Sequence, residues 1–99
     1  MKANSKIRKV AIRKEERFED GFTYRYILNM EESVRVASYK LPLYSITVEL
    51  TDKDGNTTTA DTREIFADVG KAFSFFDKLV RNLATPIDLA YVVEDEIST

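Results

Sequence analysis

Carboxylates are the side chains of this 99-residue sequence that come nearest to a reactive set. The candidates are Asp61, Glu64 and Asp68, followed near the C-terminus by Glu94, Asp95 and Glu96. Paired carboxylates can perform general acid–base catalysis, and their oxygens bind hard cations. Three acids at successive helical positions point in different directions, so the C-terminal run cannot converge on one ligand. We favour an ion-pairing role with the basic first strand for that run, and keep a cation site or carboxylate-dependent enzyme as an alternative.

A short acidic loop, Asp52-Lys53-Asp54-Gly55-Asn56, is similar to the start of a calcium-binding EF-hand loop. Its alternating oxygen ligands match the first three ligand positions of that motif. An EF-hand also needs glycine at its sixth position and a bidentate glutamate at its twelfth. Counted from Asp52, those positions hold Thr57 and Arg63. We therefore interpret the loop as a hairpin turn.

Basic side chains are concentrated at the N-terminus, where residues 1–17 have a net charge of +5 and the other residues −7. A basic strand can contact phosphates, so nucleic-acid binding is the alternative function, through Lys6, Arg8, Lys9, Arg13 and Lys14. The isoelectric point of 5.2 opposes it, because acidic surface elsewhere repels a polyanion. The favoured interpretation is a solvated edge strand whose charges protect it from edge-to-edge pairing.

The sequence contains no histidine, cysteine or tryptophan. This excludes Ser-His and Cys-His catalytic pairs, thiolate zinc sites, iron–sulfur clusters and disulfides. We therefore expect a non-enzymatic protein without cofactor or metal. No run reaches the roughly 20 apolar residues of a membrane span, and no secretory signal is recognisable at the start. We expect a soluble, cytoplasmic protein that does not contact a membrane.

Apolar residues that alternate along the chain predict an antiparallel meander of four to five strands. The turn signal Glu19-Asp20-Gly21 predicts a hairpin between the first two strands. The rings of the second strand loosely resemble an RNA-recognition motif, but that fold has helices between its strands, so we assign these rings to the core. The expected strands cover residues 6–18, 22–30, 34–39, 44–50 and 57–65.

Beyond residue 68 the apolar spacing changes to three and four, which predicts a helix. Its buried face is expected to consist of Val69, Phe73, Phe76, Val80 and Leu83. A second helix is predicted from about Pro86 to Ile97, with Thr85 as N-cap. Both helices follow the strands, so the predicted fold is α+β, a single domain over residues 1–99 with both helices on one sheet face. Residues 1–5 are expected to be disordered.

The predicted second helix is apolar nearly all round, a pattern that is typical of a helix covered on more than one side. We expect one side to pack on the preceding helix or the sheet, and the other to contact a protein partner or a second copy. We also expect two short helices to leave part of the apolar sheet face uncovered, which favours contact with a partner or a second copy as well. The candidate partner-binding residues are Tyr91, Val92, Glu94 and Asp95. A small interaction or regulatory module is the function that we expect.

The C-terminal half, from Leu43 to Ile97, resembles a family of short Firmicute proteins classed as a domain of unknown function. The resemblance rests on Tyr44-x-Ile-x-Val-Glu and on the ending Pro86-Ile-Asp-Leu-Ala-Tyr-Val-Val-Glu-Asp. The sequence departs from the family at Ser45, where glycine is common, and at Asp88, where histidine is common. The resemblance implies a bacterial cytoplasmic protein and assigns no catalytic residue.

Overall fold

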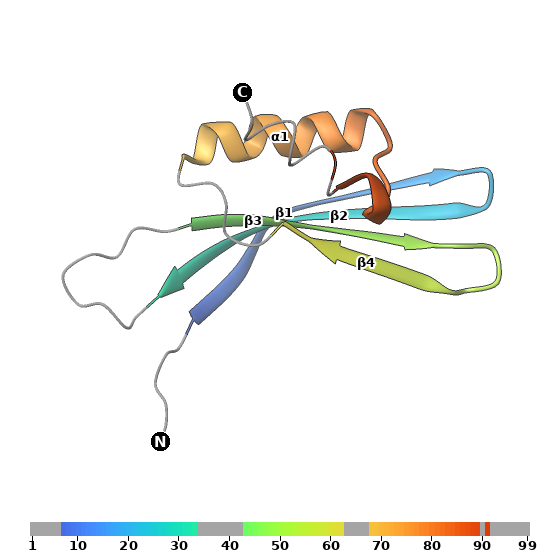
Figure 1. Cartoon of the computed structure of the whole chain (residues 1–99), viewed down its shortest axis with the longest axis horizontal. Coiled ribbons are helices and arrows are strands. Elements are labelled where there is room, and N and C mark those ends of the chain that lie inside the picture. The colour runs from blue at the N-terminus through green and yellow to red at the C-terminus, as the bar shows by residue number, and fades with distance from the viewer. Residues whose placement is uncertain (1–6, 34–42, 63–67, 90, 92–99) are drawn as a thin grey trace, which may run out of the picture.

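A computed structural model of the chain describes residues 7–33, 43–62, 68–89 and 91. Four antiparallel strands form one sheet in the order β1-β2-β3-β4, and helix α1 lies across one face of it (Figure 1). A second, short helical segment follows over residues 86–89 and 91. The predicted α+β meander with two C-terminal helices is confirmed, with four strands. The elements are β1 Ile7–Glu19, β2 Phe22–Ser33, β3 Leu43–Thr51, β4 Thr57–Asp61 and α1 Val69–Arg81.

Some sequence predictions fall outside the described residues. They concern the disordered start, the extended piece over residues 34–39, the return strand from residue 63 onward and the second helix from residue 92 onward. The same holds for the candidate residues Lys6, Glu64, Val92, Glu94, Asp95 and Glu96.

The turn between β1 and β2 confirms the predicted hairpin. Asp20 and Gly21 both have positive φ angles, +52° and +86°, which a two-residue type I′ turn requires. Gly21 is needed for space as well, because a Cβ atom there would lie 2.9 Å from Cε of Lys53. Lys53 belongs to the turn between β3 and β4, so the tips of the two hairpins lie side by side (Figure 1).

The acidic loop between β3 and β4 is a turn that the Asp52 carboxylate organises. Oδ1 of Asp52 accepts hydrogen bonds from the backbone N–H groups of Asp54 and Asn56, both at 2.9 Å. The Asn56 side chain donates a third bond, to Oδ2. These bonds, above all those from Asn56, lower the pKa of Asp52 from its ordinary value. The hairpin-turn interpretation is therefore confirmed.

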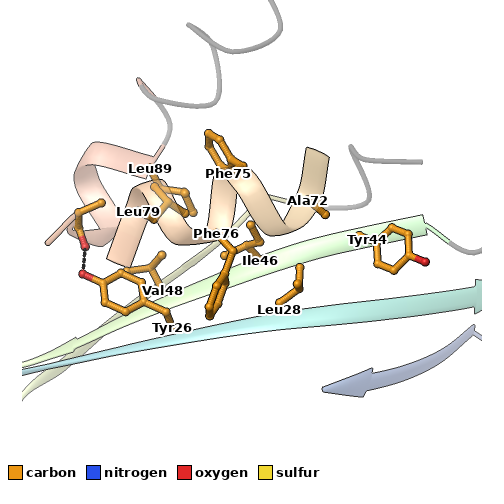
Figure 2. Packing of buried hydrophobic residues seen from close by; sticks show 11 residues of the cluster. Tyr26, Leu28, Tyr44, Ile46, Val48, Ala72, Phe75, Phe76, Leu79 and Leu89 are labelled. Carbon is orange, nitrogen blue, oxygen red and sulfur yellow. Dashed lines mark hydrogen bonds between the residues drawn. The ribbon is translucent and has the colours of Figure 1, made fainter. Parts of the chain in front are cut away.

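The core lies between the helix-side face of the sheet and α1 (Figure 2). The predicted aromatic face forms its floor, because Tyr26 and Leu28 of β2 are fully buried there. Tyr24 and Met30, further out on the same face, are only half-buried. The Tyr26 hydroxyl donates a 2.9 Å hydrogen bond to the Ala84 carbonyl, and burial raises the pKa of Tyr26 to about 12.

The predicted buried face of the first helix is wrong by about one position. The buried residues of α1 are Ala72, Phe75, Phe76 and Leu79, so only Phe76 belongs to both sets. Val69 is 42% exposed, and Phe73 and Val80 are half-buried. Leu83 lies beyond the end of α1, with a positive φ of 52°. Spacings of three and four fit two adjacent stripes of this helix, and the sheet covers the stripe that contains the small Ala72.

Both helix starts have side-chain caps. At α1, the Asp68 carboxylate accepts hydrogen bonds from the N–H groups of Gly70 and Lys71, at 2.7 and 3.3 Å. At the second helix, Thr85 and Asp88 each accept a bond from the other's backbone N–H at 3.2 Å. This reciprocal arrangement is a capping box, and it confirms Thr85 as the predicted N-cap.

Candidate functional site

The second helix has one buried and one exposed side within the described residues. Leu89 is 2% exposed and belongs to the core cluster with Leu79 and Phe75 (Figure 2). Ile87 and Tyr91 are 72% and 70% exposed. They are four residues apart and therefore neighbours on one side of a helix. We call this pair the outer stripe. The predicted packing of one side on the preceding helix or the sheet is confirmed, because Leu89 belongs to the core that both form, and the outer stripe is exposed.

The basic residues of β1 lie on both faces of the sheet, and a β-bulge decides which of them face the helix. Strand pairing places Lys9 opposite Glu31, and Lys14 opposite Ile27, on the face without the helix. The register shifts between Ala11 and Arg13, so Arg13 faces Leu28 on the helix side. Arg8 lies on β1 as well. The basic residues that sequence reasoning grouped together therefore do not form one stripe.

Two arginines on the helix side of β1 bind α1. A guanidinium nitrogen of Arg13 lies 3.6 Å from a carboxylate oxygen of Asp77. The same guanidinium stands 5.7 and 5.6 Å from the ring centroids of Phe73 and Phe76, within the range of a cation–π contact. Arg17 donates a 3.0 Å hydrogen bond to the Val80 carbonyl near the C-terminal end of α1, where positive charge is favourable. Part of the basic run therefore connects strand to helix.

A charged belt crosses three strands on the helix-free face. Arg25 of β2 donates hydrogen bonds to Glu16 of β1 at 2.9 Å and to Glu49 of β3 at 3.2 Å. Both carboxylates, Glu16 first, raise the pKa of Arg25 above its ordinary value. A depression of about 250 Å³ lies beside the belt and is lined by Lys14, Glu15, Glu16 and Arg25. Its charges are balanced, so it shows no preference for ligands of one sign.

A chain of polar side chains occupies the same face nearer β4. The Asn29 amide donates to the Thr47 hydroxyl at 3.3 Å, and that hydroxyl donates to the Asp61 carboxylate. Ser45 donates to Glu31 at 2.6 Å. Asn29, Ser45 and Thr47 are buried. Sequence reasoning missed this network, although its signal is visible as small polar residues at alternate positions of two strands.

The candidate carboxylates that the structure describes have structural roles. Asp61 joins the polar network on the sheet, and Asp68 caps α1. They stand on different elements, and no group of three acidic side chains in the described ranges is placed to hold a metal ion. The structure does not bring them together into one site.

None of the helices in the described part of the chain has the length and apolar character needed to cross a membrane.

Comparison with known proteins gives one result. Neither the curated proteins nor the solved structures include a match to this sequence. A family model described as a family of unknown function, DUF6514, matches residues 6–99. The match extends the resemblance of the C-terminal half to almost the whole length, including the β1–β2 hairpin. The chain therefore belongs to the DUF6514 family.

Proposed function

We propose that this chain is a small, non-enzymatic interaction module of the bacterial cytoplasm that binds a protein partner through the outer stripe. The observation that carries the proposal is the exposure of Ile87 and Tyr91 on one side of a helix whose Leu89 is buried. Single exposed apolar residues are ordinary on protein surfaces. Two large ones at i and i+4 form a helix face of the kind that docks into a groove of a partner.

The polar residues of the described chain support the same proposal. Arg13, Arg17 and Arg25 are engaged in contacts between secondary-structure elements. The Asp61 carboxylate accepts a hydrogen bond within the sheet. Catalysis needs side chains that converge on a reacting atom and are free to act on it. The polar groups described here instead hold strands and helices together, which suits a module whose surface does the work.

The test is affinity capture from an extract of the native cell with three forms of the tagged protein. They are the wild type, Tyr91→Glu, and the control Lys71→Glu, which changes an exposed residue of α1. We expect a protein that the wild type and the control retain and that Tyr91→Glu loses. The purified candidate should then bind the wild type at least tenfold more tightly than Tyr91→Glu in calorimetry. Equal binding by all three forms would refute the outer stripe as the binding surface.

Nucleic-acid binding stays as the second candidate because of one observation. Lys9 and Lys14 are exposed on the same face of β1, and neither makes an ion pair within the described residues. If they contact phosphates, labelled single- or double-stranded oligonucleotides should bind at low salt, and the affinity should fall steeply as salt is added. The double variant Lys9→Glu/Lys14→Glu should then lose this binding. No binding by the wild type at low salt would eliminate this candidate.

A further inference from the structure

The outer edge of β4 is unpaired within the described residues, because this strand pairs only with β3 there. The strand, Thr57–Asp61, is nearly uniformly exposed and has the sequence Thr-Thr-Thr-Ala-Asp. Edge strands are usually protected against pairing by lysine, proline or a bulge. β4 contains none of these, and threonine is a favourable strand residue. Its short length and the single charge of Asp61 are the usual protections that the strand itself shows.

The direction of each backbone group of β4 follows from two hydrogen bonds at the ends of the β3–β4 ladder. Thr62 N–H donates to the Ile46 carbonyl, and Asp52 N–H to the Asn56 carbonyl, both at 2.9 Å. Hydrogen-bonded pairs alternate with non-bonded pairs along an antiparallel ladder. Thr58 and Ala60 therefore direct their N–H and C=O groups toward β3. Residues 57, 59 and 61 direct theirs away from the sheet.

We propose that two copies of this chain associate by antiparallel pairing of their β4 edges about a two-fold axis at Thr59. The two four-stranded sheets would then form one continuous sheet. In this register Thr59 faces Thr59 of the partner subunit, and Thr57 faces Asp61 of the partner subunit. All of these residues have outward backbone groups, so each facing pair exchanges both of its hydrogen bonds.

Side-chain chemistry favours a second copy over an unrelated strand as the occupant of this edge. Thr57, Thr59 and Asp61 pair with residues of the helix-free face, so they meet the partner's residues on that face. Cross-strand Thr–Thr pairs are stabilising, and like charges directly opposite each other are destabilising. The proposed register opposes threonine to threonine in the centre and threonine to aspartate on both sides. Thr47 donates to Oδ1 of Asp61, which leaves Oδ2 to accept from the Thr57 hydroxyl of the partner subunit. That hydroxyl lies 2.9 Å from the Thr51 hydroxyl of its own chain, and it can accept from Thr51 while it donates across the interface.

The first test is the solution mass of the 11.4 kDa chain across a concentration series. A small interface is weak, so the series should run from about 10 µM to about 1 mM. Sedimentation equilibrium should show the mass rising toward twice that of one chain. Thr59→Pro should stay monomeric, because it removes the central outward N–H and no bond of the β3–β4 ladder. The control Thr59→Val keeps that N–H and should associate like the wild type.

The second test uses charge at the two-fold axis. Thr59→Lys and Thr59→Glu should each be monomeric, since each would place like charges opposite each other. An equimolar mixture of the two should form a heterodimer, because the opposed charges become complementary. Circular dichroism of each variant confirms that the fold is retained.

Three results would overturn the proposal. They are a monomeric wild type at every concentration, a dimer that withstands both Thr59→Pro and Thr59→Lys, and a dimer that Tyr91→Glu dissociates. The last would move the interface to the second helix. Partner capture by the outer stripe is measured separately, so a monomeric wild type would leave the proposed function standing.

Discussion

Strand β1 closes one edge of the sheet with thirteen residues, a bulge and a row of charged side chains, whereas β4 closes the other with five residues and one charge. Helix α1 packs on β2 and β3, so the two edge strands reach the core in different ways. The helix side of β1 is spanned by Arg13 and Arg17, which extend to α1. On the β4 side, Ala60 packs against the core directly. Two side chains of the charged β1 edge thus hold strand and helix together, whereas β4 has a single charge and outward backbone groups that no described segment pairs with.

The structure gives the basic N-terminal run a different role from the one that its sequence suggests. Seven basic residues in the first 17 suggest a polyanion site when they are counted along the sequence. In the structure the bulge turns Arg13 toward the helix and leaves Lys9 and Lys14 on the other face. Charged side chains on an edge strand can therefore protect it from pairing with another chain and hold it to the helix. An edge strand with little charge is the better candidate for association.

The largest expected effect separates the two sides of β4 itself. Thr58→Pro removes an N–H that faces β3 and leaves its acceptor unpaired, so it should lower the free energy of unfolding by about 2–3 kcal/mol. Thr59→Pro removes an N–H that faces outward and should cost less than about 1 kcal/mol. Urea denaturation at a concentration where the protein is monomeric measures both. Similar losses for the two variants would mean that the assigned backbone directions are wrong, and with them the open edge.

Alkaline titration tests the centre of the sheet, through the buried hydroxyl of Tyr26. Below pH 10, Tyr26 is protonated in the folded and unfolded states alike. Between pH 10 and about 12, the unfolded chain releases this proton while the folded chain retains it, so stability falls by roughly 2 kcal/mol. Thermal melting across this range should show the loss, and Tyr26→Phe should flatten it. An equally steep profile in Tyr26→Phe would assign the effect to other tyrosines.

A smaller effect tests whether the charged edge is held by the helix. Arg13→Ala removes the contacts with Asp77, Phe73 and Phe76 and should lower stability by about 1 kcal/mol. Arg13→Lys keeps the charge but loses the planar group that stacks on the rings, so it should recover only part of this loss. Chemical denaturation at low and high salt measures both variants. An unchanged stability in Arg13→Ala would show that β1 does not depend on this contact.

The sequence predicted the strands, turns and helix starts better than it predicted how these elements pack against one another. Strict alternation located β2 and β3, and turn and cap residues located both hairpins and the start of the second helix, because these signals are local. The buried face of α1 was misplaced because Ala72 carries little hydrophobic signal and the sheet decides which stripe is covered. Which of the basic residues face the helix depends on one bulged position in β1, which no local pattern marks. The partners of Asn29 and Thr47 lie on other strands, so only the register reveals that network.

The central claim is that the β4 edge is open to a second copy and the β1 edge is not. Amide hydrogen exchange measured by NMR at low and high protein concentration tests it most directly. We expect the N–H groups of Thr57, Thr59 and Asp61 to exchange quickly in dilute solution and to become protected as concentration rises. Those of Thr58 and Ala60 should be protected throughout, and the outer amides of β1 should exchange quickly at both concentrations. Protection that rises with concentration along β1, with none at Thr59, would contradict the claim.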